Sequence, residues 1–333
     1  MENDPVFGGY FYAGGGSATY AYTSDSGDGT INSSAGSGAY DEIIGDALVD
    51  FLSTRVQGWT TDDSTQWGIG GFGMGAYGAF RAAMMHPNTF HSVSGVDGPM
   101  DFDGPDGNSG LINLVDQVFM EQNIPYGVDS AYKRFDTAGA WHASRLFVGG
   151  SIAFSPLDTL VYTTILVAGP QGGGTGPSRQ IVRVDSTFKV DPATAPTAIT
   201  DLVKLSQEGG KDFDFLLPFD ANGTMVNDVW NDKWLPNNLE SLFSDEPGAQ
   251  GALTNADIWI GSSDQARFGY HDQTQSWYNT IAAVHPNNSA DTLVWYDYDG
   301  YAGYGASHDQ YVYDLLREML IFHDRSFKKA QGR

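Results

Sequence analysis

Residues 67–80 read Trp67-Gly68-Ile69-Gly70-Gly71-Phe72-Gly73-Met74-Gly75-Ala76-Tyr77-Gly78-Ala79-Phe80, and this stretch decides the fold. The short apolar segment Trp67–Phe72 predicts a strand. Ala76–Met85 predicts a helix that is closed by His86-Pro87. The glycines between the two segments allow a sharp turn, because glycine adopts backbone angles that other residues avoid. The stretch therefore predicts a strand that turns directly into a helix.

Further segments continue this pattern along the chain. His91–Val96 predicts the next strand, so the order is strand, helix, strand with tight turns, which is typical of a parallel sheet in an α/β fold. Other strands are expected at Tyr10–Ala13, Phe213–Leu217, Ala256–Ile260 and Thr292–Tyr296. Other helices are expected at Tyr40–Val56, Leu111–Gln122, Gln273–Val284 and His308–Phe322.

The length of the chain bounds its organisation. At 333 residues, a folded chain buries roughly three quarters of its unfolded surface, which is enough for one large domain. We expect a single α/β domain over residues 1–333. Residues 129–200 are less regular and predict a cap-like, β-rich insertion. Within it, Leu157–Ala168 and Gln180–Val190 are expected to pair across a Gly- and Pro-rich turn.

Composition and charge exclude some partners. Lys and Arg total 17 and Asp and Glu total 41, which gives a net charge of −24. Such a charge repels nucleic acid and anionic membranes. No apolar run is long enough to span a bilayer, and no signal peptide is visible. The acidic excess, the 42 glycines and the few lysines favour an extracellular or cell-surface protein. A structural subunit of an extracellular assembly, and hence an oligomer, is one of the hypotheses that this composition leaves open.

The residues of the glycine turn also bear on the chemistry that the protein could carry out. In the motif G-x-S-x-G a strand-to-helix turn presents a nucleophilic serine, and the acid and histidine that complete the triad follow later in the chain, in that order. Here the centre of the motif is Gly73. Asp264 follows an apolar strand, and His308 begins a helix after a glycine-rich loop. The order predicts Asp264 as the residue that orients His308, and His308 as the base.

These segments resemble an esterase branch of the α/β-hydrolases that includes esterase D-like enzymes, feruloyl-type esterases and mycolyltransferases. Gly71–Ala79 looks like the nucleophile elbow of that family, residues 86–90 look like the segment that follows it, and Ile258–Phe268 looks like the strand and loop that carry the acid. The resemblance implies ester hydrolysis or acyl transfer by a Ser-His-Asp mechanism, with the backbone N–H of Met74 as an oxyanion donor. The nucleophile position falls on Gly73, and the early strands of the family have no clear match, so the N-terminal strands are expected to be missing or altered.

Three readings of Gly73 follow from the resemblance. The first is a catalytically silent, esterase-like protein that is retained for binding or for a structural role. The second is an active esterase or acyltransferase whose native form carries serine at position 73. The third is different chemistry by a bound water or by another residue, for which Ser94 and Ser262 are candidates. The ligand in each case is expected to be a small ester or a carbohydrate-linked molecule.

Two further groups are candidates for binding. The aromatic residues Trp230, Trp234 and Tyr304 lie in segments expected near the cleft and suit sugar rings or phenolic acids. The acids Asp101, Asp103 and Asp106 alternate with glycines in a loop, a pattern that suits Ca²⁺ although it lacks the EF-hand spacing. No other cofactor is expected, and the absence of cysteine excludes disulfides and thiolate metal sites.

Overall fold

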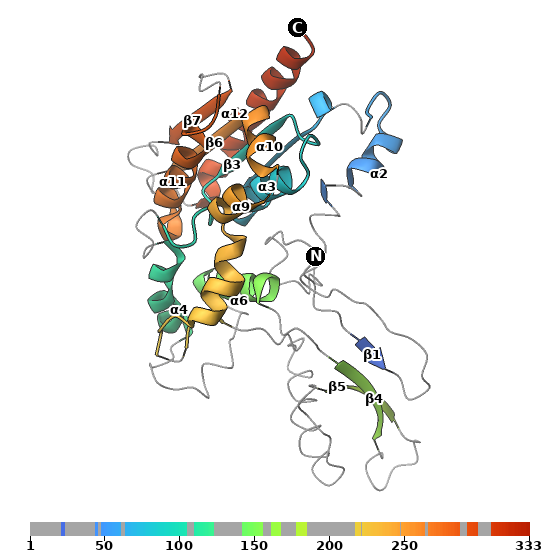
Figure 1. Ribbon diagram of the computed structural model, residues 1–333, viewed down its shortest axis with the longest axis vertical. Helices are drawn as coiled ribbons and strands as arrows, with labels where there is room; N and C mark the ends of the chain where they lie inside the picture. Colours follow the sequence, from blue (N-terminus) through green and yellow to red (C-terminus); the bar gives the residue numbers. More distant parts are fainter. Residues whose placement is uncertain are drawn as a thin grey trace.

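A computed structural model describes residues 21–23, 44–45, 48–60, 64–104, 110–122, 142–155, 161–167, 178–184, 217–220, 222–246, 248–263, 266–286, 292–298 and 308–333. Its main sheet has four strands in the order β2-β3-β6-β7 (Figure 1). They are β2 (Gly68–Phe72), β3 (Ser92–Val96), β6 (Asp257–Ser263) and β7 (Leu293–Tyr298). All neighbouring pairs are parallel, so the four carboxyl ends share one edge. The α/β class that the sequence predicts is confirmed.

Helices cover both faces of this sheet. Helix α3 (Met74–Met85) packs on β2 and β3, α11 (Tyr270–Ala282) packs on β6, and α12 (His308–Ala330) packs across β2, β3 and β6. Successive residues of a strand point to opposite faces. Gly95 faces Phe80 of α3, whereas the hydroxyl of Ser94 contacts His323 of α12. Helices α3 and α12 therefore lie on opposite faces of the sheet.

The hydrophobic core is divided by the sheet into two clusters. The larger cluster joins α3 and α11 to the sheet and extends to the helices further out. The smaller one lies under α12 and consists of Val96, Trp259, Leu315, Met319 and Phe322. The contact between α12 and the sheet is thus apolar, with polar contacts toward the carboxyl end of the helix.

Several segments between the strands differ from expectation in their bounds. The helix expected at Leu111–Gln122 consists of a 3₁₀ turn, η3 (Gly110–Leu114), and α4 (Val115–Gln122). The helix expected at Tyr40–Val56 is described as α2 (Leu48–Arg55). The remaining helical segments are η2 (Ser64–Gln66), α8 (Asn227–Val229), the π-helical turn η4 (Trp230–Trp234), η5 (Leu235–Asn237), α9 (Leu239–Asp245), α10 (Ala249–Asn255) and η6 (Arg267–Gly269). The expected strand Tyr10–Ala13, and Phe213–Leu217 except its last residue, lie outside the described residues.

The segment expected to be a cap contains two different kinds of structure. Helix α6 (His142–Phe154), which the sequence did not predict, contributes Ala143, Leu146, Phe147 and Phe154 to the main core. The strands β4 (Val161–Val167) and β5 (Ser178–Val184) pair antiparallel as expected, and β1 (Ala21–Thr23) joins β4 in a separate three-stranded sheet. Residues 142–154 therefore belong to the main packing unit, while the expected β pairing forms a second sheet.

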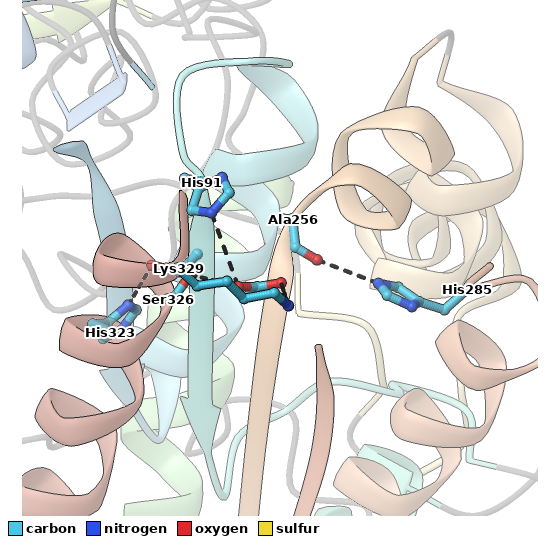
Figure 2. A network of polar contacts seen from close by, with 8 residues as sticks. His91, Ala256, His285, His323, Ser326 and Lys329 are labelled. Carbon is cyan, nitrogen blue, oxygen red and sulfur yellow. Dashed lines mark hydrogen bonds and ion pairs between the residues drawn. The ribbon is translucent and has the colours of Figure 1, made fainter. Parts of the chain in front are cut away.

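The amino ends of β3 and β6 are tied to α12 by polar contacts (Figure 2). The hydroxyl of Ser326 donates to Oδ2 of the buried Asp257 at 2.7 Å. The side chains of His91 and Lys329 each lie 3.9 Å from the same carboxylate. Behind it, Nε2 of His285 lies 3.3 Å from the carbonyl oxygen of Ala256. This edge is occupied by stabilising contacts, so the opposite, carboxyl edge is the place to look for a functional site. None of the helices in the described residues is long and apolar enough to cross a membrane.

Candidate functional site

The glycine turn between β2 and α3 has the backbone of a strained strand-to-helix elbow. Gly73 has φ 57° and ψ −125°, a region that a residue with a side chain occupies at a cost of about 1–3 kcal/mol. Its N–H donates to the carbonyl oxygen of Val96 at 2.9 Å, and its own carbonyl oxygen accepts from the N–H of Ala76 at 3.0 Å. These two hydrogen bonds tie the turn to strand β3 and to helix α3. Residue 73 directly follows β2, so it lies at the carboxyl edge of the sheet.

The turn requires glycine at a second position. A Cβ atom on Gly71 would lie 2.2 Å from the carbonyl oxygen of Gly75, whereas a Cβ atom on Gly75 would meet nothing within 4 Å. The strand can therefore approach the first turn of α3 closely only because residue 71 lacks a side chain.

A pair of substitutions tests this requirement. We expect Gly71→Ala to lower the free energy of unfolding by about 1–3 kcal/mol, the usual cost of overpacking. Gly75→Ala is the matched control, because alanine there should be neutral or raise stability by up to about 1 kcal/mol through its helix propensity. Urea denaturation of both variants measures the difference. Equal stabilities would contradict the close approach of strand and helix.

Helix α3 begins at Met74. The first N–H groups of an α-helix have no acceptor within the helix, and the helix dipole favours negative charge there. The N–H of Met74 follows the turn directly, so a developing oxyanion beside residue 73 would meet it. The role of Met74 as an oxyanion donor stays a prediction.

A buried carboxylate stands one strand away from the elbow. Asp97 directly follows β3, is 0% exposed and has φ 45°, an uncommon angle for a residue with a side chain. Its Oδ1 accepts from the hydroxyl of Ser262 at 2.7 Å and from the N–H of Ser263 at 3.2 Å. The sequence analysis does not single out Asp97. The signal that could have identified it is its place directly after the strand that neighbours the elbow strand.

The two serines named as substitute nucleophiles have other partners. Ser262 is fully buried and donates to Asp97, and Nδ1 of His271 lies 3.1 Å from its oxygen. Ser94 is also fully buried, and its oxygen lies 2.8 Å from Nε2 of His323 on the α12 face. Neither hydroxyl is presented to solvent as an attacking nucleophile must be. The sequence did not single out His271.

The side chains of the expected acid and base are not among the described ones. Asp264 comes directly after β6, but it lies outside the described residues, as does Tyr304. His308 is the first residue of α12, and only its backbone is described. Because β2, β3, β6 and β7 run parallel, the elbow, Asp97 and the chain after β6 leave the sheet at the same edge. The roles of Asp264 and His308 stay predictions.

The two tryptophans expected to contact substrate lie in the core. Trp230 is 5% exposed and Trp234 is 0% exposed, and their rings stack at 5.8 Å between centroids. Trp234 also packs against Phe102, Phe147 and Phe154, and its Nε1–H donates to the hydroxyl of Ser155 at 3.3 Å. In the structure these side chains therefore fill the interior that supports the site, and contact with a substrate stays a prediction.

The expected calcium ligands are partly described. Asp101 is buried, and burial raises the pKa of its carboxyl group, with a further increase from the nearby Asp103. The amide of Asn238 donates to Oδ1 of Asp101 at 3.4 Å and to Oδ1 of Asp103 at 3.0 Å. Asp106 lies outside the described residues. Among the described residues no group of three acids or histidines is arranged to hold a metal. An asparagine side chain thus bridges the two acids, and a Ca²⁺ ion in this loop stays a prediction.

Comparisons with known protein families, sequences and structures give weak guidance on the family of this chain. No family model and no curated protein sequence matches the chain. Among solved structures, the chain is similar to a mutant of esterase E22, with 12% sequence identity and a TM-score of 0.35. The alignment covers 86% of this chain, and this chain spans 65% of the length of that one. We therefore take the fold from the strands and helices described above.

Proposed function

We propose that this chain is an esterase-like α/β-hydrolase that does not hydrolyse esters at its elbow and is retained for binding or for a structural role. The observation that supports this most strongly is the backbone of Gly73, with φ 57° and ψ −125° at the turn from β2 to α3. The turn keeps the shape in which a nucleophile would be presented, but glycine offers no oxygen. The low identity to esterase E22 adds nothing to this reasoning.

The surrounding residues are compatible with a silent site. Ser94 and Ser262 are both fully buried and hydrogen-bonded, so neither replaces the missing hydroxyl. Loss of the serine from a triad lowers turnover by on the order of 10⁶-fold. The ligand we propose is a small neutral ester or a carbohydrate-linked molecule, because a net charge of −24 repels anions.

The test is an esterase assay on the chain as it stands. We expect hydrolysis of p-nitrophenyl butyrate at the rate of a buffer blank that contains an unrelated protein. We also expect no covalent labelling by a fluorophosphonate, which reacts only with an activated serine. Saturable hydrolysis together with a labelled serine would refute the silent reading and favour a nucleophile elsewhere in the chain.

A further inference from the structure

The carboxyl edge holds a second polar group beside the elbow, and its proton positions can be counted. An ionised carboxylate only accepts hydrogen bonds, and a serine hydroxyl has one proton to donate. The hydroxyl of Ser262 donates that proton to Oδ1 of Asp97 at 2.7 Å. Its oxygen can then take part in the 3.1 Å contact with Nδ1 of His271 only as an acceptor. A neutral His271 therefore carries its proton on Nδ1 and leaves the lone pair of Nε2 available as an acceptor.

Hydrogen bonds favour the ionised form of the Asp97 carboxyl group, which ends this series of contacts. Asp97 accepts a second hydrogen bond, from the N–H of Ser263 at 3.2 Å, and hydrogen bonds to a carboxylate favour its charged form. Burial raises the pKa of the neighbouring Tyr270, and the negative charge of Asp97 raises it further. Tyr270 thus stays a neutral phenol and does not compete for the charge. The two hydrogen bonds that link Asp97, Ser262 and His271 therefore keep their direction.

The imidazole is presented beside aromatic rings that remain partly accessible. His271 lies in the first turn of α11 and is half-buried, as are Tyr278 on the same helix and Trp295 on β7. The ring centroid of Trp295 lies 6.0 Å from that of His271 and 5.3 Å from that of Tyr278. Within the part of the chain that the structure describes, no hydrogen bond involves Nε2 of His271. Among the described residues, this acceptor thus has no protein partner, and it stands next to two aromatic rings.

We propose that His271, Tyr278 and Trp295 form a binding site for a neutral, hydroxylated ring, of which a saccharide is the representative class. Nε2 accepts a hydrogen bond from a ligand hydroxyl, and the aromatic rings contact the apolar face of the ligand ring. Acidic saccharides are disfavoured because the chain has a net charge of −24, which repels anions. This site deepens the proposed function, since it gives the ligand of that function a place at the same edge of the sheet.

The tautomer of His271 is the first test. Long-range ¹H–¹⁵N correlation spectra of the full chain at pH 7.5 should show His271 with its proton on Nδ1. The variant Ser262→Ala removes the acceptor of that proton, and the Nδ1–H form should lose its dominance. A proton on Nε2 in the unsubstituted chain would overturn the proposal, because Nε2 would then be a donor.

Binding is the second test. The labelled full chain is applied to an array of neutral and uronic-acid-containing oligosaccharides. We expect retention on neutral saccharides, and about 3- to 10-fold weaker retention for His271→Ala, the loss of roughly one hydrogen bond. The control Trp59→Ala, which removes a 40% exposed tryptophan that packs edge-to-face with Trp67 before β2, should bind as the unsubstituted chain does. Absence of retention, a preference for acidic saccharides, or equal binding by the His271 variant overturns the proposal.

The outcome is independent of the elbow chemistry. Retention does not require a hydroxyl at residue 73, so saccharide binding by a chain that proves to be an active esterase would contradict the proposed function alone. A silent chain without retention would contradict the binding site alone. Melting temperatures of all variants identify any loss of binding that is due to unfolding.

Discussion

Gly73→Ser is expected to create ester hydrolysis in a chain that we propose to be silent. The backbone at residue 73 already has φ 57° and ψ −125° at the entry to α3, so a serine would present its hydroxyl at the carboxyl edge of the sheet. The sequence predicts Asp264 and His308 as the acid and base for that hydroxyl. If that pair is assembled as the sequence predicts, turnover of p-nitrophenyl butyrate should rise by up to about 10⁶-fold. The same substitution should lower the free energy of unfolding by about 1–3 kcal/mol, because a residue with a Cβ atom takes over a strained conformation.

Two variants separate the hydroxyl from the strain. Gly73→Ala introduces the same backbone strain without an oxygen, so it should lose similar stability and stay inactive. Adding His308→Ala to Gly73→Ser should return turnover to near the blank. Steady-state kinetics and fluorophosphonate labelling measure all three chains. A folded Gly73→Ser protein that neither turns over the ester nor is labelled would show that the base is not assembled beside residue 73, and would contradict the hydrolase interpretation.

The strands and helices around the elbow could be predicted because each is specified locally. Trp67–Phe72 and His91–Val96 are short and rich in apolar or β-branched residues, and the helix between them ends at a proline, so periodicity and breakers suffice. The observed strands Gly68–Phe72 and Ser92–Val96 differ from the expected bounds by one residue. Helix α6 was missed because its sequence, with Gly149 and Gly150 inside it, weakens the helical signal. Its stability comes from Phe147 and Phe154 packing into the core.

The side-chain groups of the site could not be predicted from spacing alone. Ser262 and Asp97 are 165 residues apart, and they meet only because β3 and β6 are neighbours in the sheet. His271 follows Ser262 by nine residues and reaches it because the chain turns through η6 into α11. Trp234 was read as a cleft residue because aromatics suit sugars, but the same side chain suits a core equally well. The burial of such a side chain depends on the tertiary fold, so spacing along the sequence does not reveal it.

The α12 face of the sheet holds a histidine whose titration should affect stability. Nδ1 of His323 lies 2.6 Å from the hydroxyl oxygen of Ser92, and Nε2 lies 2.8 Å from that of Ser94. Both serines are fully buried on β3, and a Cβ atom on Gly68 would lie only 2.7 Å from Nδ1. A neutral imidazole donates one hydrogen bond and accepts one, which matches two hydroxyl partners. Burial lowers the pKa of His323 from 6.5 to about 4.

We therefore expect acid to destabilise the fold through His323. In the unfolded chain His323 takes up a proton near its ordinary pKa of 6.5, whereas in the folded chain its imidazole stays neutral down to about pH 4. Stability is unaffected by this group above pH 6.5 and falls as the pH decreases through that window, by about 3 kcal/mol in total. Urea denaturation at pH 7.5 and pH 4 measures the decrease in the free energy of unfolding between the two pH values. In His323→Gln this decrease should be smaller by about 3 kcal/mol, since an amide does not titrate. The control Arg325→Gln, an exposed change on the same helix, should keep the full pH dependence of stability. If His323→Gln loses as much stability at pH 4 as the unsubstituted chain does, His323 is not the group that is neutral in the folded state.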